Sequence, residues 1–339
     1  MTEAAARAMV LHRQGLVESG PLHLERWPLP LPGAGEVRLR VHCCAICRTD
    51  LHVIEGDLPA LRTPLVPGHQ VVGTVEALGA GCRRLRVGQR VGGAWLRHTC
   101  GRCGYCRTGR ENLCEAARFT GYHEHGGFAD FAVVPEDFAY EIPAAFADEA
   151  AAPLLCAGII GYRALQRSDL PAGGSLALFG FGSSAHVVLQ IARHRGCRVY
   201  AVSRGGAHLA HARRMGADWA GERAEELPEP VDSAIVFAPV GTLVPAALAA
   251  VKKGGTVALA GIHMTDVPAL NYERHLFYER NLRSVTANTR ADGAGLLAEA
   301  ARIPIRPDVT RYRLEDANRA LQELKAGRIA GTGVLMMEG

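Results

Sequence analysis

Residues 175–185 read Ser175-Leu-Ala-Leu-Phe-Gly180-Phe-Gly182-Ser-Ser-Ala185, an apolar run that ends in the pattern G-x-G-x-x-A. The run predicts a buried strand, and the stretch after it predicts a helix of about ten residues. Between a strand and a helix, such glycines form a dinucleotide-binding fingerprint: Gly180 permits the tight turn, Gly182 lets the backbone approach the pyrophosphate, and Ala185 allows close helix packing. A tight turn without a ligand is the alternative. We assign Gly180, Gly182, Ser183 and Ala185 to cofactor binding.

The sequence beyond this turn alternates apolar strands with helical patterns rich in Ala and Leu. The strands are expected at residues 198–203, 233–237 and 256–260. Such alternation favours parallel βαβ units, so residues 156–288 are expected to form a Rossmann domain with a doubly wound parallel sheet. Upstream, short alternating strands broken by Gly and Pro predict a β-rich domain over residues 1–155. Residues 289–339, with an amphipathic helix and a short strand, are expected to return to that first domain.

Composition and charge exclude several classes of function. The chain has 339 residues, enough for about two domains, and its 48% hydrophobic and 21% charged residues are typical of a globular protein. Its net charge of +4 is scattered, which argues against a nucleic acid or an anionic membrane as partner. The longest apolar run, residues 150–162, is shorter than the roughly 18 residues of a membrane span, and no secretory signal is visible. We therefore expect a cytoplasmic protein.

Four cysteines are concentrated in one loop, at about residues 97–115, with the spacing Cys100-x2-Cys103-x2-Cys106-x7-Cys114. Four thiolates at this density are typical of a closed tetrahedral zinc site, which is structural because no coordination position stays open. Cysteines without a metal and an iron–sulfur cluster are the alternatives. A DNA-reading zinc module is disfavoured because no basic recognition helix accompanies the loop.

Three further residues offer metal ligands outside this loop: Cys47, His69 and Cys156. Singly, each is more often a packed cysteine or a surface histidine than a ligand. Together, two thiolates and an imidazole are the set expected for a catalytic zinc whose fourth position is open to water or substrate.

With these motifs in this order, the chain resembles the zinc-dependent alcohol dehydrogenases of the medium-chain dehydrogenase/reductase superfamily. The resemblance extends over nearly all 339 residues and rests on Cys47-Arg-Thr-Asp-Leu-His52, Gly68-His69, the four-cysteine loop, Cys156 and the glycine turn. It implies an α/β protein with a GroES-like β-rich catalytic domain and a Rossmann domain. It also implies two zinc ions per chain, hydride transfer between a small-molecule alcohol and NAD(P) to give an aldehyde or ketone, and a homodimer or homotetramer.

The resemblance implies a role for each residue of the three-ligand set. Cys47, His69 and Cys156 would bind the catalytic zinc, and Asp50 would orient the His69 imidazole. One departure is Gln70, where the family usually has a Glu directly after the ligand histidine. In polyol-type relatives that Glu is itself a metal ligand, and a neutral amide is a poor replacement, which favours Cys156 as the third ligand here.

The resemblance also implies neighbours for the substrate and the cofactor. Thr49 would hydrogen-bond the substrate oxygen and begin a proton relay that ends at His52. Arg48 would lie near the cofactor pyrophosphate. Trp95 and Leu96 resemble residues that line the alcohol pocket of bacterial members, although a core tryptophan is an equally common interpretation.

The end of the second Rossmann strand bears on the choice of cofactor. NAD-preferring enzymes place an Asp or Glu there to bind the ribose hydroxyls, whereas this chain has Ser203-Arg204. A hydroxyl followed by a guanidinium accepts a 2′-phosphate through charge-assisted hydrogen bonds, so NADP is favoured and NAD stays possible. A second departure is Thr332, near where many relatives have an Arg on the pyrophosphate.

The sequence thus predicts a zinc-dependent, NAD(P)-linked alcohol dehydrogenase. Two alternatives remain. One is a quinone or enone reductase of the same superfamily, whose members lack these cysteine sets. The other is a zinc-stabilised NADP-binding redox sensor without turnover.

Overall fold

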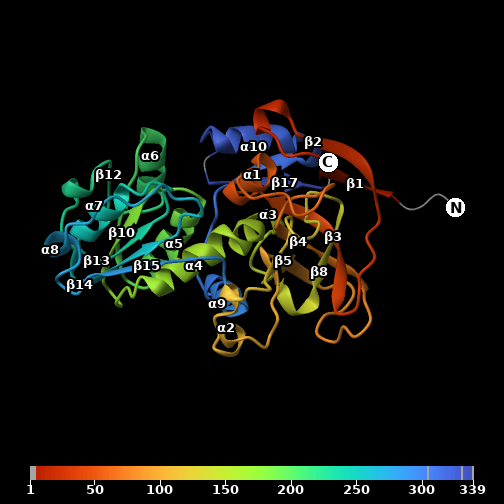
Figure 1. Ribbon diagram of the computed structural model, residues 1–339, viewed down its shortest axis with the longest axis horizontal. Helices are drawn as coiled ribbons and strands as arrows, with labels where there is room; N and C mark the ends of the chain where they lie inside the picture. The colour runs from red at the N-terminus through yellow and green to blue at the C-terminus, as the bar shows by residue number, and fades with distance from the viewer. Residues whose placement is uncertain (1–4, 304, 330, 338–339) are drawn as a thin grey trace. The chain divides into compact units, whose positions relative to one another are not determined.

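The structure is a computed structural model that describes residues 5–303, 305–329 and 331–337 (Figure 1). The chain divides into two compact units, and the N-terminal part of unit 1 ends at Cys156. Unit 1 also includes Ala287–Ala301 and the segment from Asp308 onward. Unit 2 holds Ala157–Thr286 and Arg302–Pro307.

Unit 1 is rich in strands. Its strands are β1 (Ala5–Leu11), β2 (Leu22–Pro28), β3 (Glu36–Ala45), β4 (Gln70–Leu78), β5 (Arg90–Gly93), β6 (Leu96–His98), β7 (Arg118–Phe119), β8 (Phe131–Pro135), β9 (Ala139–Glu141), β16 (Val309–Arg313) and β17 (Thr332–Met336). Its helices are α1 (Arg48–Glu55), α2 (Gly104–Arg107), α3 (Asp148–Ala151), α9 (Arg290–Ala300) and α10 (Ala317–Lys325). Short 3-10 helices lie at Val17–Ser19, Glu111–Leu113, Glu136–Phe138, Ala152–Leu155 and Leu314–Asp316.

The main sheet of unit 1 is built around β3. The strand order is β16-β17-β3-β4-β5-β9, and β8 also pairs with β3. Strand β3 runs antiparallel to β4, β8 and β17, while β16 and β17 are parallel to each other. Val37, Leu39 and Val41 alternate along β3 with less buried positions, and they join an apolar core of the unit. The alternation follows because successive strand residues point to opposite faces of a sheet.

Unit 2 holds one parallel sheet with the order β12-β11-β10-β13-β14-β15. Its strands are β10 (Ser175–Phe179), β11 (Arg198–Val202), β12 (Trp219–Gly221), β13 (Val231–Val236), β14 (Val251–Leu259) and β15 (Asn281–Ser284). Its helices are α4 (Ala157–Arg167), α5 (Ser183–His194), α6 (Gly206–Arg214), α7 (Leu243–Ala250) and α8 (Tyr272–His275), with a 3-10 helix at Ala224–Glu226. When the six strands are numbered by their order in the sequence, their order across the sheet is 3-2-1-4-5-6. This is the doubly wound arrangement, and it confirms the predicted fold class.

Helix α4 packs closely on α5, the helix that follows the glycine turn. A Cβ at Gly161 of α4 would lie 2.7 Å from Val188 of α5, so the close approach depends on a glycine here. The sequence patterns did not indicate that Arg302–Pro307 belongs to unit 2. Its backbone is held there by a hydrogen bond, because the N–H of Arg306 donates to Gln190 Oε1 of α5 at 2.9 Å. Among the residues that the structure describes, no helix has the length and apolar character needed to cross a membrane.

A half-buried histidine joins two loops of unit 1. The N–H of Val66 donates to Nδ1 of His125 at 3.2 Å, and the His125 ring meets Trp27 edge-on at 5.2 Å. Burial, reinforced by the charge of Arg62, lowers the pKa of His125 to about 4, although Glu124 opposes this shift. A proton on Nδ1 would also remove the acceptor that Val66 uses.

We predict that His125 makes unit 1 sensitive to acid. Between pH 6.5 and about 4 the unfolded chain binds a proton on this ring and the folded chain does not. The free energy of unfolding therefore rises with pH in this window and falls on acidification. The free energy of unfolding, measured with urea at pH 4.5, 5.5 and 7, should depend less on pH in His125→Asn than in the wild type. Asn keeps an acceptor for Val66 but does not titrate. Parallel curves for the two proteins would contradict this prediction.

Candidate functional site

Cys47 caps the N-terminus of helix α1. Its Sγ accepts the backbone N–H of Thr49 at 3.4 Å, and its own N–H donates to Asp50 Oδ2 at 2.8 Å. These two bonds form a capping box, in which a side chain at the cap and one three residues on satisfy each other's free backbone groups. The cap also places a sulfur at the positive end of a helix, where a thiolate is stabilised.

His69 is fully buried and its ring is oriented by the same Asp50. The ring Nδ1 lies 3.0 Å from Asp50 Oδ1, so Nε2 remains as the free nitrogen. That Nε2 lies 3.3 Å from Cys47 Sγ. Asp50 is itself 2% exposed, and burial raises the pKa of its carboxyl group. One carboxylate thus fixes the start of α1 and the direction of the imidazole.

Cys156 completes this cluster from the end of the 3-10 helix Ala152–Leu155. Its Sγ lies 4.0 Å from Cys47 Sγ, and the three donor atoms all lie within 4.8 Å of one another. In a tetrahedral zinc site with the usual bond lengths, two sulfurs are about 3.8 Å apart and a sulfur and a nitrogen about 3.6 Å. The arrangement of Cys47, His69 and Cys156 therefore fits a zinc ion with three protein ligands.

The electrostatics of the cluster favour a thiolate at Cys47. A hydrogen bond from Cys156 and the nearby His69 lower the pKa of Cys47 well below its ordinary value, against the opposing effect of burial. Burial alone would lower the pKa of His69, but Asp50 and Cys47 outweigh it and raise the pKa to about 10. These shifts describe a thiolate at Cys47 paired with a protonated His69 imidazole, whose proton a zinc ion at this position would displace.

The residues expected near the substrate lie on the same helix. Thr49 is buried beside Cys47, and His52 follows one turn later. The His52 ring is partly exposed, and its Nδ1 lies 2.7 Å from Asp57 Oδ2. Arg48, at the first position of α1, is exposed. Thr49 and His52 therefore lead along one helix from the buried cluster to the surface.

Gln70, the residue after His69, is the unusual neighbour of the cluster. It opens β4 and is fully buried, and neither its amide nitrogen nor its amide oxygen has a hydrogen-bond partner among the described residues. A buried amide without a partner is costly, typically by about 1–3 kcal/mol. In the described part of unit 1, no protein group pairs with this side chain.

Three aromatic side chains stack on one another, and one of them, Trp95, meets the His69 ring. The Trp95 indole meets the His69 ring edge-on at 5.0 Å, with 72° between the planes. Phe119 stacks on Trp95 at 4.8 Å and 12°, and Tyr122 lies nearly parallel to Trp95 at 6.0 Å and 17°. We call Trp95, Phe119 and Tyr122 the aromatic wall. Leu96, by contrast, is buried in the core.

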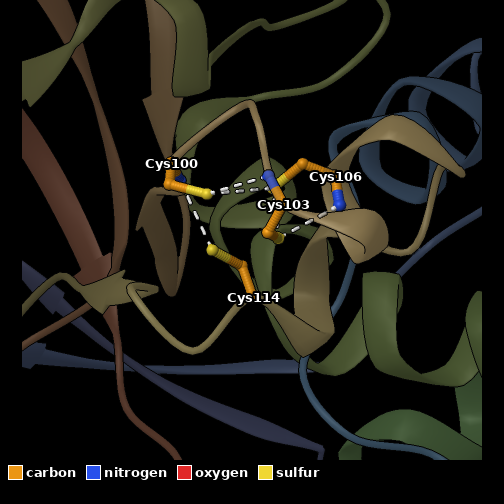
Figure 2. Close-up of side chains that lie close together, drawn as sticks. All are labelled: Cys100, Cys103, Cys106 and Cys114. Atoms are coloured by element: carbon orange, nitrogen blue, oxygen red, sulfur yellow. Dashed lines mark hydrogen bonds between the residues drawn. The ribbon is translucent and has the colours of Figure 1, made fainter.

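The four cysteines of the loop come together in a second cluster (Figure 2). The Sγ of Cys106 lies 4.0 Å from that of Cys100 and 3.5 Å from that of Cys103, and all four sulfurs lie within 4.8 Å of one another. Backbone N–H groups of Arg102 and Cys103 point at Cys100 and lower the pKa of its thiol to about 6. Each of the ten cysteines in the chain is free of disulfides. The spacing of this cluster fits a four-thiolate zinc site.

An ion pair between a buried Glu111 and a partly exposed Arg290 anchors the four-cysteine loop to helix α9. Glu111, three residues before Cys114, accepts hydrogen bonds from Arg290 through the backbone N–H at 2.8 Å and through the guanidinium at 2.6 to 3.1 Å. Arg290 also lies over the Phe138 ring at 4.7 Å. This anchor connects positions 179 residues apart, and the sequence analysis missed it because no local pattern marks it.

In unit 2 the glycine turn has the form predicted from sequence. Gly180 adopts a φ of +89°, and a Cβ there would lie 2.9 Å from the Ala238 nitrogen. Gly182 caps α5, and a Cβ there would meet nothing within 4 Å. Ser183 opens α5, and Ala185 is fully buried in it. The helix N-terminus thus faces open space bordered by backbone, which is the setting that binds a pyrophosphate.

The end of β11 lies next to this turn. The N–H of Gly180 donates to Val202 O at 2.8 Å, and the next residue, Ser203, is 8% exposed. Arg204 is exposed. Ser203 N–H donates to Gly221 O of the neighbouring strand β12. The residue after Gly221 is Glu222, which is exposed. The sequence analysis did not consider this carboxylate, because Glu222 comes near Ser203 through the pairing of β11 with β12 and not through its distance along the chain from the glycine turn.

Thr332, the other departure from the family pattern, opens β17 of unit 1 and is buried there.

The fold and the two clusters define a class of protein. A GroES-like β unit, a Rossmann unit and two sets of residues suited to bind zinc are the features of a zinc-type medium-chain dehydrogenase. Family comparison agrees, since residues 33–144 match the alcohol dehydrogenase GroES-like domain and residues 185–302 match the zinc-binding dehydrogenase family.

Among similar proteins, a probable alcohol dehydrogenase AdhA of Mycobacterium tuberculosis is 48% identical, over 99% of each chain. An alcohol dehydrogenase of Geobacillus stearothermophilus is 33% identical, over 94% of this chain and 97% of its own. A solved cinnamyl alcohol dehydrogenase from Sorghum bicolor superposes with a TM-score of 0.88 at 26% identity, over 99% of this chain and 100% of its own.

The chain therefore belongs to the zinc-type alcohol dehydrogenases of the medium-chain superfamily, as the sequence predicted. It is an oxidoreductase that acts on alcohols.

Proposed function

We propose that this oxidoreductase is zinc-dependent and NAD(P)-linked, and that it interconverts small primary or secondary alcohols with aldehydes or ketones. The observation that carries the proposal is the convergence of Cys47 Sγ, His69 Nε2 and Cys156 Sγ within 4.8 Å. When bound there, zinc supplies a Lewis acid with one open position, which polarises the reacting oxygen. The alternatives, a redox sensor and a quinone or enone reductase, are not favoured by the alcohol dehydrogenase relatives.

The protein groups around this centre divide the remaining work. Asp50 holds the His69 ring so that Nε2 faces the two sulfurs. The Thr49 hydroxyl, buried next to Cys47, would hold the proton of the reacting oxygen. His52, one turn along α1 and partly exposed, would pass that proton toward solvent. We assign Cys100, Cys103, Cys106 and Cys114 to a second, structural zinc. Reduced ligand thiols suit a reducing compartment, so we propose a cytoplasmic location.

The two zinc roles lead to opposite mutant phenotypes. The wild type should contain two zinc ions per chain by elemental analysis. Cys47→Ser should retain the structural zinc and the fold but lose about a thousandfold or more in kcat/KM, because a Lewis acid supplies several kcal/mol of transition-state stabilisation. Cys103→Ser should lose the structural zinc and lower the thermal midpoint. The matched control is Cys82→Ser, whose Sγ donates to Glu36 O far from both clusters in the sequence, and it should keep both ions. Equal destabilisation of the Cys47 and Cys103 variants would contradict the division.

For the cofactor we propose NADP, with Gly180, Gly182, Ser183 and Ala185 at the pyrophosphate and Ser203 and Arg204 at the 2′-phosphate. Arg48 is assigned to the pyrophosphate as well. The open space in front of Gly182 and the helix N-terminus support the first group. The absence of a carboxylate at position 203 supports the second, because an acidic residue there would repel a phosphate.

The choice of cofactor is tested at Ser203. Ser203→Asp should shift the ratio of kcat/KM with NAD to kcat/KM with NADP toward NAD by about tenfold or more, equivalent to at least 1.4 kcal/mol. Arg204→Gln should lower kcat/KM with NADP and leave that with NAD nearly unchanged. A wild type that strongly prefers NAD would refute the assignment and point to the carboxylate of Glu222 as the ribose ligand.

We also propose that the enzyme is a homo-oligomer, a dimer or a tetramer. Strand β15 ends the sheet of unit 2, so one of its edges has no strand partner among the described residues. Large apolar side chains around it are exposed, including Ile262, Tyr272, Phe277 and Leu282. An unpaired strand edge with apolar surroundings is a surface that proteins usually cover.

Sedimentation velocity of the zinc-loaded protein should give a mass of at least two chains. Leu282→Lys should shift the protein toward a single chain, because it places a charge on the strand edge. Leu31→Lys changes a more exposed leucine, in unit 1, and serves as the control. A wild type that sediments as a single chain would argue against assembly.

A further inference from the structure

A second hydrogen-bonded series of polar side chains lies in unit 1, on strands β3 and β4 and at the start of helix α3. Thr74 Oγ1 lies 3.1 Å from His42 Nε2, and His42 Nδ1 lies 2.7 Å from Asp148 Oδ2. Asp148 Oδ1 in turn lies 2.7 Å from Arg90 Nε of β5. None of these four residues belongs to either cysteine cluster.

The carboxylate determines which nitrogen of the His42 ring carries the proton. Paired with Arg90, the Asp148 carboxylate only accepts hydrogen bonds, so His42 Nδ1 donates to it. In the neutral ring Nε2 is then an acceptor, and the Thr74 hydroxyl donates to it. A hydroxyl, an imidazole that accepts its proton and a carboxylate that orients the imidazole are the parts of a base-activated nucleophile.

An irregularity of β3 aims His42 at Thr74. Between Val41 and Cys43 the pairing of β3 with β4 shifts by one residue, which leaves His42 as an extra residue in β3. Such bulges redirect a side chain and are frequent beside active sites. The backbone N–H of Met337, just after β17, donates to His42 O at 3.0 Å and holds the bulge.

This series of groups is accessible from solvent. The side chains of His42 and Asp148 are each 27% exposed, and Thr74 is half-buried. Residues on this face of β3 and β4 are less buried than the neighbours with which they alternate, which point into the core. A small molecule can therefore reach the Thr74 hydroxyl.

Two arginines flank Thr74. Arg40 of β3 and Arg90 of β5 lie directly opposite Thr74 in the neighbouring strands, so the three side chains share one face of the sheet. Each guanidinium is also paired with a carboxylate, Arg40 with Glu76 at 2.9 Å and Arg90 with Asp148. A guanidinium has five N–H donors, more than one such pair uses. Positive charge at this distance stabilises an oxyanion that forms beside the hydroxyl.

We propose that Thr74, His42 and Asp148 form a second catalytic centre, which hydrolyses small carboxylic esters with a good leaving group through an acyl intermediate on Thr74. The centre acts independently of the proposed alcohol chemistry. The competing interpretation is that the three side chains only hold helix α3 against β3 and β4, on which it packs (Figure 1). In that case the Thr74 hydroxyl does not react.

The reaction is a two-step acyl transfer to water. Thr74 Oγ1 bonds to the ester carbonyl carbon while its proton passes to His42 Nε2. The bond from that carbon to the leaving oxygen then breaks, and His42 returns the proton to the departing alcohol. A water molecule next gives a proton to His42 and bonds to the acyl carbon, the bond to Thr74 breaks, and His42 restores the hydroxyl proton. One ester and one water give one acid and one alcohol.

The first test follows the hydrolysis of para-nitrophenyl acetate by release of nitrophenolate, above the rate without protein. Thr74→Val keeps a branched side chain but lacks the nucleophile, so we expect a loss of at least about tenfold. Thr74→Ser, which keeps a hydroxyl, should retain most of the activity. Thr310→Val changes a half-buried threonine of β16 in the same sheet and should leave the rate unchanged.

The general base is tested with a matched pair of histidine variants. His42→Gln should lose at least about tenfold in ester hydrolysis. His12→Gln removes another histidine that contacts a carboxylate, Glu25 at 2.6 Å, and should have no effect. Both variants, and Thr74→Val, should oxidise alcohols as the wild type does.

The second test identifies the nucleophile directly. Incubation with para-nitrophenyl dimethylcarbamate, whose carbamoyl product hydrolyses slowly, should place one carbamoyl group on Thr74, detected by mass spectrometry of the peptides. Cys47→Ser, which should lose alcohol turnover, should still be labelled at Thr74 and should still hydrolyse the acetate.

Four outcomes would overturn the proposal. They are a wild type that hydrolyses the acetate no faster than buffer, equal rates for the wild type and Thr74→Val, carbamoyl groups on other residues but not on Thr74, and loss of ester hydrolysis in Cys47→Ser. The last result would assign ester hydrolysis to the Cys47 centre. A wild type that hydrolyses the ester but oxidises no alcohol would overturn the proposed function and leave this inference standing.

Discussion

The carboxylate of Asp50 is the group on which the proposed metal centre depends. One oxygen accepts the N–H of Cys47 and so begins helix α1, and the other holds Nδ1 of His69. The bond to His69 is buried and the bond to Cys47 is partly buried, and losing the carboxylate would leave two donors unsatisfied. A cysteine and a histidine 22 residues apart are thereby positioned by a single side chain. The start of α1 and the positions of two proposed metal ligands therefore depend on the same side chain.

Much of the architecture could be predicted from local spacing. The glycine turn, the alternating strands and the four-cysteine loop each lie within a short stretch, and spacing within such a stretch determines local geometry. The Rossmann sheet and the family assignment were confirmed for this reason. The roles of Cys47, His69 and Cys156 as ligands stay a prediction, although the structure brings their donor atoms together.

Other features could not be predicted because they depend on pairing between distant segments. The Glu111 and Arg290 anchor, the stacking of Phe119 and Tyr122 on Trp95, and the position of Glu222 beside Ser203 leave no periodic trace in the sequence. The buried, unpartnered amide of Gln70 is a further case. The family pattern showed that residue 70 is a Gln in place of the usual Glu. That the Gln70 amide has no hydrogen-bond partner among the described residues follows only from the packed structure.

The pairing of β17 with β3 also determines when the first unit can be completed. Met336, Leu335 and Val334 pair with Cys43, Cys44 and Ala45 in the middle of the unit 1 sheet. This partner of β3 is therefore synthesised after all six strands of unit 2, which lie within residues 175–284. Unit 1 is the later of the two units to be completed. Until then residues 43–45 of β3, beyond the pairing with β8 at residues 36–40, lack their strand partner and are open to association with other nascent chains.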